Sequence, residues 1–167
     1  MKHYLLIVII SITLVSCTNN KTTKIEREGE PEIYGFAEND EEMNQAIKMA
    51  KETLDKFNEA LKSGNPAFEY FALKTKFNTS NGSEHIWVSS ITLKENKYFG
   101  VVDNLPEFTT DVNLGDTIQI KEEDISDWMY IENQKLQGGY TIRVLRNSMT
   151  EEERKQFDEE YGLLIED

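Results

Sequence analysis

The sequence is poor in the residues that most often carry chemistry. Its 167 residues include one cysteine, Cys17, and two histidines, His3 and His85. A single cysteine excludes an intramolecular disulfide. A zinc site of the usual kind is excluded as well, because His85 is the one histidine after residue 16 and no cysteine set accompanies it. We therefore expect neither a metal nor any other cofactor.

Sequence motifs of known catalytic sites are also missing. The chain has no glycine-rich phosphate loop and no Gly-x-Ser-x-Gly nucleophile elbow. No residue can therefore be assigned a catalytic role from a motif.

Positive charge is scarce too, with 18 Lys and Arg against 31 Asp and Glu, which gives a formal net charge of −13. Nucleic-acid binding depends on clustered Lys and Arg, so a nucleic-acid partner is not expected. Only three prolines and 38% hydrophobic residues indicate a chain that can bury a core.

The most specific signal lies at the N-terminus. An uncharged apolar run, Tyr4–Val15, follows Lys2 and ends at Ser16 and Cys17. It is too short to span a bilayer, which takes about 20 apolar residues, and it has the length of a secretory h-region. The string Leu14-Val15-Ser16-Cys17 resembles a bacterial lipobox. We therefore expect a lipoprotein signal peptide over residues 1–16 and lipidation of Cys17. The protein would then be anchored to a membrane by lipid and would not span it.

The next segment, residues 17–39, is polar, mixed in charge and interrupted by Gly29, Pro31 and Gly35. This composition predicts a flexible tether. Thr18, in place of an aspartate after the cysteine, resembles an outer-membrane sorting signal. We expect a protein anchored in the outer membrane and facing the periplasm.

Residues 40–167 read as a single α+β domain. Apolar residues spaced by three and four positions predict a long helix from Asp40 to about Ser63, where Gly64 and Pro66 stop it. These apolar residues are Met43, Ile47, Ala50, Leu54, Phe57 and Leu61. The stripe is too short for a coiled coil, so we expect the helix to pack on a sheet.

Five or six antiparallel strands are predicted after this helix, in a sheet that could close in part. The expected strands are 68–77, 85–93, 98–103, 116–120, 128–132 and 136–145, with turns at Asn81-Gly82, Glu95-Asn96 and Asn133-Gln134. Gly138-Gly139 predicts a bulge or a close strand approach. Thr150 and Glu153 form a capping box that begins a short C-terminal helix ending near Gly162.

Seven polar and aromatic residues on or beside the expected strands form the candidate site: His85, Trp87, Asp103, Asn104, Asp127, Trp128 and Arg143. His85 could serve as an acid or base, with Asp127 orienting it and Arg143 clamping an anion. A structural or binding role is the favoured interpretation, because a lone histidine, core tryptophans and an Asp/Arg pair are more often structural.

Several short strings in the same order resemble the bacterial domain of unknown function 2314, the YegJ-like proteins, over about residues 40–146. They are Met43–Ile47, His85–Val88, Gly100–Pro106, Gly115-Asp116, Ile125–Tyr130 and Gly138–Val144. The resemblance implies a compact bacterial domain, often secreted or lipid-anchored, and the seven candidate residues match its pattern. It supplies no activity, cofactor or catalytic residue.

Three functional hypotheses remain open. The leading one is a non-enzymatic, lipid-anchored envelope module that binds a protein or a small molecule. The second is a hydrolase-like enzyme using His85, and the third is a purely structural envelope protein.

Overall fold

The computed structural model describes residues 22–27, 30–36, 40–80, 82–162 and 164–165. The expected signal peptide (residues 1–16) and Cys17 lie outside these ranges, so both remain predictions. Within the described ranges no helix is long and apolar enough to cross a membrane.

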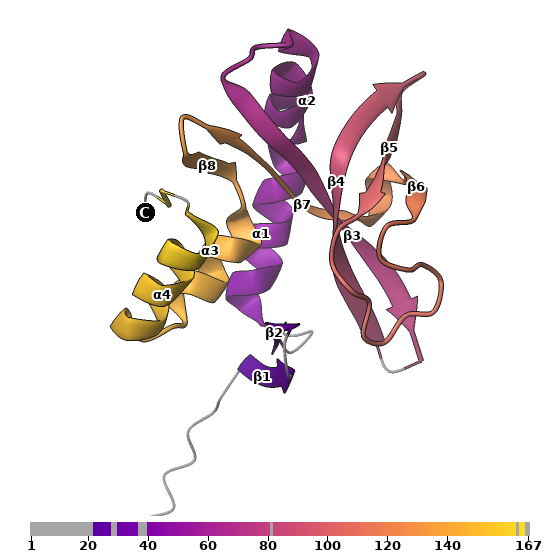
Figure 1. The fold of residues 1–167 in the computed structure, drawn as a ribbon. Coiled ribbons are helices and arrows are strands. Elements are labelled where there is room, and N and C mark those ends of the chain that lie inside the picture. The colour runs from indigo at the N-terminus through magenta and orange to yellow at the C-terminus, as the bar shows by residue number, and fades with distance from the viewer. Residues whose placement is uncertain (1–21, 28–29, 37–39, 81, 163, 166–167) are drawn as a thin grey trace, which may run out of the picture.

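The chain has an α+β fold, as predicted, built around a six-stranded antiparallel sheet that does not close into a barrel (Figure 1). The strand order is β6-β5-β4-β3-β7-β8. The strands are β3 (Phe68–Thr79), β4 (Gly82–Lys94), β5 (Lys97–Val102), β6 (Thr117–Ile120), β7 (Ile125–Glu132) and β8 (Lys135–Gly138). The helices are α1 (Glu41–Glu52), α2 (Leu54–Ser63), α3 (Tyr140–Asn147) and α4 (Glu151–Tyr161), with a 3₁₀ turn at Glu122–Asp124.

Two tight hairpins connect neighbouring strands where the sequence predicts them. Glu95 and Asn96 both have positive φ between β4 and β5, as do Asn133 and Gln134 between β7 and β8. Such two-residue loops match the twist of the strands that they join. They fix the register on each side of the sheet.

The predicted long helix is divided in two at Thr53. Asp40 caps α1 by accepting a hydrogen bond from the Met43 N–H, and Gly64 ends α2 at φ 61°. The Ala50 carbonyl, which would accept from Leu54 in a continuous helix, accepts instead from the Trp128 indole N–H at 3.0 Å. A side chain inserted into the helical ladder produces a kink, and here it separates α1 from α2.

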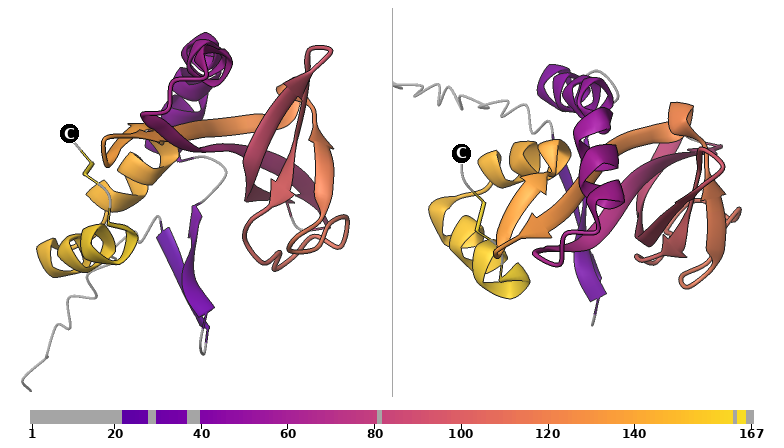
Figure 2. Two further views of the ribbon diagram at one scale, coloured as in Figure 1. Left: turned by 45° about the horizontal axis from the view of Figure 1, so that its top comes forward. Right: turned by 90° about the horizontal axis from the view of Figure 1, so that it is seen from above.

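Helices α1 and α2 cover one face of the central strands (Figure 2). Phe57 is fully buried between these helices and the sheet, against Trp128 and Phe71. Leu73 and Val88, which lie opposite each other on β3 and β4, complete this core from the strands. The expectation that the helix packs on the sheet is confirmed.

The prediction that residues 136–145 form one strand is wrong after Gly138. β8 ends there and α3 begins at Tyr140, because Gly138 and Gly139 turn the chain through the left-handed region at φ 72° and 61°. The alternation of apolar and polar residues in this short segment fits a helical face as well as a strand. Gly138 does approach a strand closely, as predicted: an added Cβ would lie 2.3 Å from the Trp128 carbonyl oxygen.

The two ends of the described chain add smaller elements. Within the segment predicted as a tether, β1 (Thr22–Arg27) and β2 (Glu30–Phe36) form a separate two-stranded antiparallel sheet. The C-terminal helix α4 has the expected capping box of Thr150 and Glu153 and ends at Gly162.

Candidate functional site

The face of the sheet opposite α1 and α2 carries polar side chains. In the register of β3 and β4, Lys74 lies opposite Trp87 and Lys76 lies opposite His85. Residues paired in this way, and those two positions apart on one strand, share a face. These four side chains therefore form one surface, here called the lysine face. Trp128 pairs with Leu73 and lies on the helix-covered face.

Lys74 stands at the centre of this surface and is half-buried. Its Nζ donates to the Thr141 hydroxyl at 3.2 Å and lies 5.5 Å from the centre of the Trp87 ring. Burial lowers the pKa of Lys74 below its ordinary value, and Asp127 partly opposes this shift. An ammonium group has three donors, and Lys74 uses one of them on a neutral acceptor.

Asp127 is fully buried and holds the start of α3. Its carboxylate accepts four hydrogen bonds, from the main-chain N–H groups of Trp128, Tyr140 and Thr141 and from the Thr141 hydroxyl at 2.6 Å. Burial raises its pKa, while these donors and Lys74 oppose the shift. Since each oxygen already accepts two donors at a helix N-terminus, we infer that the carboxylate is ionised at neutral pH.

A β-bulge brings a serine to His85. Lys74 pairs with Asp127 and Thr75 pairs with Ile125, which leaves Ser126 as the extra residue of β7. The Ser126 hydroxyl donates to the Lys74 carbonyl at 3.2 Å and lies 2.7 Å from His85 Nδ1. With the serine proton so used, Nδ1–H donates to Ser126.

His85 is therefore a neutral imidazole surrounded by positive charge. Burial lowers its pKa to about 4, and the charges of Lys74, Lys76 and Lys51 add to the shift. An imidazole with this pKa is a weak base at neutral pH. Its hydrogen bond goes to Ser126 and the bonds of Asp127 go to α3, so the expected pairing of the two does not form.

Asp103 and Asn104 join this surface from the end of β5. The Asn104 side chain accepts from the Trp87 main-chain N–H at 2.8 Å, and the Asp103 N–H donates to the Trp87 carbonyl at 2.9 Å. The Tyr70 hydroxyl donates to the Asp103 carboxylate. These contacts hold the backbone of Trp87 in place, and its side chain is half-buried against the cluster of Ala72, Met129 and Leu136.

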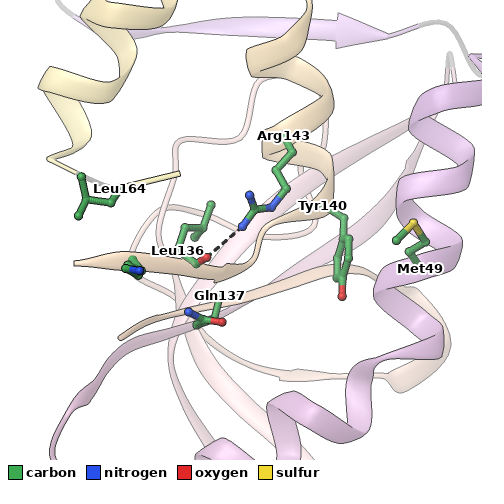
Figure 3. Close-up of a pocket in the computed structure, with 7 residues that line it drawn as sticks. Met49, Leu136, Gln137, Tyr140, Arg143 and Leu164 are labelled. Atoms are coloured by element: carbon green, nitrogen blue, oxygen red, sulfur yellow. Dashed lines mark hydrogen bonds between the residues drawn. The ribbon is translucent and has the colours of Figure 1, made fainter. Parts of the chain in front are cut away.

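Arg143 lies at a different place. Its guanidinium donates to the main-chain carbonyls of Leu136 and Gly138, at 3.0 and 3.1 Å, and so braces the turn between β8 and α3 (Figure 3). A shallow open pocket of about 390 Å³ adjoins it, lined by Met49, Lys135, Leu136, Gln137, Tyr140, Arg143 and Leu164. Because its arginine is engaged with the backbone, this pocket is a weaker candidate for anion recognition than the lysine face.

Of the seven sequence candidates, the structure brings His85, Trp87, Asp103 and Asn104 together around the lysine face. Asp127 is buried beside them, and Trp128 and Arg143 lie elsewhere. Sequence reasoning missed Lys74, Ser126 and Thr141. A lysine between aromatic residues in the strand Phe68–Phe77 was the one available signal, because the bulge and the helix that place the other two leave no sequence mark.

The described part of the chain contains no group of three or more His, Cys, Asp or Glu side chains that could hold a metal ion. Within the described ranges the Lys74 ammonium group has one hydrogen-bond acceptor, and the lysine face adds a second lysine and an indole surface. Such a combination can bind an oxyanion that carries an apolar part.

Comparison with known proteins gives a consistent family relationship. Residues 40–165 match the family described as "Uncharacterized protein conserved in bacteria (DUF2314)". The chain is 38% identical to the uncharacterized protein YegJ of Escherichia coli K12 over 111 residues, which are 66% of this chain and 71% of YegJ. It is 32% identical over 143 residues to a putative ankyrin repeat protein of Neisseria meningitidis serogroup B, covering 81% of this chain and 56% of that protein. No solved structure matches significantly.

Proposed function

From the premise that the chain belongs to the bacterial DUF2314 family, we propose that it is a binding module of the cell envelope, whose lysine face binds a small oxyanion such as a carboxylate or a phosphate. One observation carries the proposal. The Lys74 ammonium group is half-buried, yet among the described residues its one hydrogen bond goes to a neutral hydroxyl at 3.2 Å.

A buried charge is costly unless it is paired and hydrogen-bonded. Asp127 lies nearby, but its oxygens accept from α3 and from Thr141, so it reaches Lys74 through the Thr141 hydroxyl. A bound oxyanion would take the remaining donors of Lys74 in charge-assisted hydrogen bonds. Burial lowers the pKa of Lys74 although Asp127 opposes the shift, so a bound anion would further stabilise the charged form of the lysine.

The surroundings favour an anion over a cation. Lys76 shares the face, and burial together with the lysine charges lowers the pKa of His85, in a chain whose formal net charge is −13. Trp87 offers the edge or face of its indole to an apolar part of the ligand. Lys74 and Lys76 thus place two positive charges on one small surface, beside the buried Asp127 and the Asp103 carboxylate.

The same contacts support a non-enzymatic role. A hydrolase would need a base poised near neutral pH, whereas burial and the neighbouring lysines lower the pKa of His85 to about 4. Ser126, which hydrogen-bonds to His85, is 2% exposed and cannot readily meet a substrate.

Isothermal titration calorimetry with inorganic phosphate, acetate and benzoate tests the proposal. We expect saturable binding of at least one of them, weakened about tenfold or more in Lys74→Met, since hydrogen bonds to charged groups contribute about 1.5–3 kcal/mol. Lys62→Met, an exposed change on α2, is the matched control and should bind as wild type does. Equal affinity in Lys74→Met and wild type, or no binding of any of the three anions, would refute the proposal.

We also propose that the module is tethered to the outer membrane, facing the periplasm, through lipid on Cys17. The support is the apolar run Tyr4–Val15 ending at Ser16 and Cys17. Two or more acyl chains anchor a protein stably. The acidic body would be repelled from anionic headgroups and so stand away from the surface.

A further inference from the structure

The long loop between β5 and β6, residues 103–116, exposes three large apolar side chains. Phe108 is 60% exposed, Leu114 is 55% exposed and Leu105 is 43% exposed. Loops of this length without helices or strands are uncommon in small domains and often carry function. Single exposed apolar residues need no explanation, but three on one loop do.

The backbone of this loop is held firmly by hydrogen bonds. The Glu84 carboxylate on β4 accepts from the N–H groups of residues 107, 108 and 109, at 2.7, 3.0 and 2.8 Å. The Glu84 side chain therefore fixes three consecutive main-chain N–H groups, and Phe108 is the middle residue of the three. The loop holds it outward although the cost of exposing an aromatic ring to water is considerable.

Further contacts fix the second half of the loop. Val112 is 7% exposed and packs with Ile86 and Val102 beneath the loop. The Gly115 N–H donates to the Val102 carbonyl, and the Asp116 carboxylate accepts from the Asn113 N–H at 2.7 Å. A surface ordered before binding loses little conformational entropy when a partner binds.

The charge of the loop restricts its partner. Residues 103–116 include four acidic residues, Asp103, Glu107, Asp111 and Asp116, and no lysine or arginine. A second copy of this chain that met the loop with its own loop would bring like charge to the same place, and an anionic bilayer surface would be repelled. A protein segment that combines lysine or arginine with apolar side chains is complementary in both respects.

We propose that residues 103–116 form a docking surface for a basic, apolar segment of a partner protein, with Phe108, Leu114 and Leu105 as its apolar contacts. This surface adjoins the lysine face through Asp103 and Asn104, but its three apolar side chains are not among the four that form the lysine face. Its acidic residues would meet the partner's positive charges around an apolar centre, which is the usual anatomy of a protein interface.

The test measures binding of a fluorescent synthetic peptide of lysine and leucine by anisotropy, using the full chain. We expect Phe108→Ser to weaken binding about tenfold, as for a central interface residue. Leu114→Ser should act in the same direction. Met49→Ser, a change at a 42% exposed residue of α1, is the matched control and should bind as wild type does.

Two further probes separate the alternatives. A lysine and serine peptide and a glutamate and leucine peptide should each bind about tenfold more weakly than the lysine and leucine peptide, because each keeps one of the two complementary features. The proposal is overturned if Phe108→Ser and Leu114→Ser both bind the first peptide as wild type does. It is also overturned if either control peptide binds equally well, or if phosphatidylcholine vesicles bind more tightly than the peptide in a way that needs Phe108.

Discussion

A single carboxylate, that of Asp127, connects β7 to the first turn of α3 and stands one hydroxyl group away from Lys74. The role considered for it from the sequence, orienting His85 as an acid or base, gives way to a role in positioning α3. It fixes Thr141, and Thr141 in turn fixes the Lys74 ammonium group. The lysine face thus depends on a buried residue that no ligand would touch.

Asp127→Ala should lower the free energy of unfolding by about 2–5 kcal/mol, because it leaves buried main-chain N–H groups and the Thr141 hydroxyl without their acceptor. Urea denaturation measures this change. Glu123→Ala, an exposed acidic change a few residues earlier, should stay within about 0.5 kcal/mol of wild type. A small effect of Asp127→Ala would mean that α3 does not need its cap.

His85 predicts a pH dependence of stability. Its pKa is about 4 in the folded protein, lowered by burial and then by the lysine charges, against about 6.5 in an unfolded chain. Between these values the unfolded state binds more protons, so stability falls as the pH drops from about 6.5 toward 4. In His85→Gln this part of the slope should vanish. An NMR titration that gives His85 a pKa of 6 or higher would contradict the prediction.

At the scale of elements, the turn between β8 and α3 decides the geometry of the site. Strand alternation in residues 136–145 suggested one continuous strand, and the sequence could not show otherwise because the segment is short. The strand ends at Gly138 and Gly139. The close approach of Gly138 to a neighbouring strand was predictable from the sequence, but the turn into a helix was not.

Two glycine substitutions separate backbone strain from close packing. Gly64 has φ 61° and open space around an added Cβ, so Gly64→Ala should cost about 1–2 kcal/mol. Gly138 has φ 72°, and an added Cβ would lie 2.4 Å from the Trp128 ring as well as against its carbonyl. Gly138→Ala should therefore be clearly the more destabilising of the two in thermal melts. Equal losses would show that the chain relaxes freely at this turn.

For the whole molecule, the parts of the fold set by local patterns could be predicted: the helical stripe, the hairpin turns, the capping box and the α+β class. The lysine face could not. It depends on strand register, on the bulge at Ser126 and on a helix that begins where a strand was expected. These are long-range consequences of packing, and they bring Lys74 to Thr141 across 67 positions of sequence.

The anchor is tested on the whole protein in its bacterial host. Labelled fatty acid should be incorporated into the wild-type chain, which should sediment with membranes, whereas Cys17→Ala should carry no label and leave the membrane fraction. Label that stays on the Cys17→Ala protein, or a wild-type protein found entirely in the soluble fraction, would contradict lipidation at this residue.

The positive charge that we propose for the face around Lys74 and Trp87, on a strongly acidic protein, can be measured directly. Collisional quenching of tryptophan fluorescence by charged ions measures the sign of charge around Trp87. The contribution of Trp87 is obtained as the difference in fluorescence between wild type and Trp87→Phe. With each quenching constant expressed relative to that of free N-acetyltryptophanamide, iodide should quench Trp87 more strongly than caesium at equal ionic strength, and Lys74→Met should remove most of that preference. If the relative quenching constant of caesium equals or exceeds that of iodide, the surface around Trp87 is not positively charged. That result would contradict the proposed lysine face.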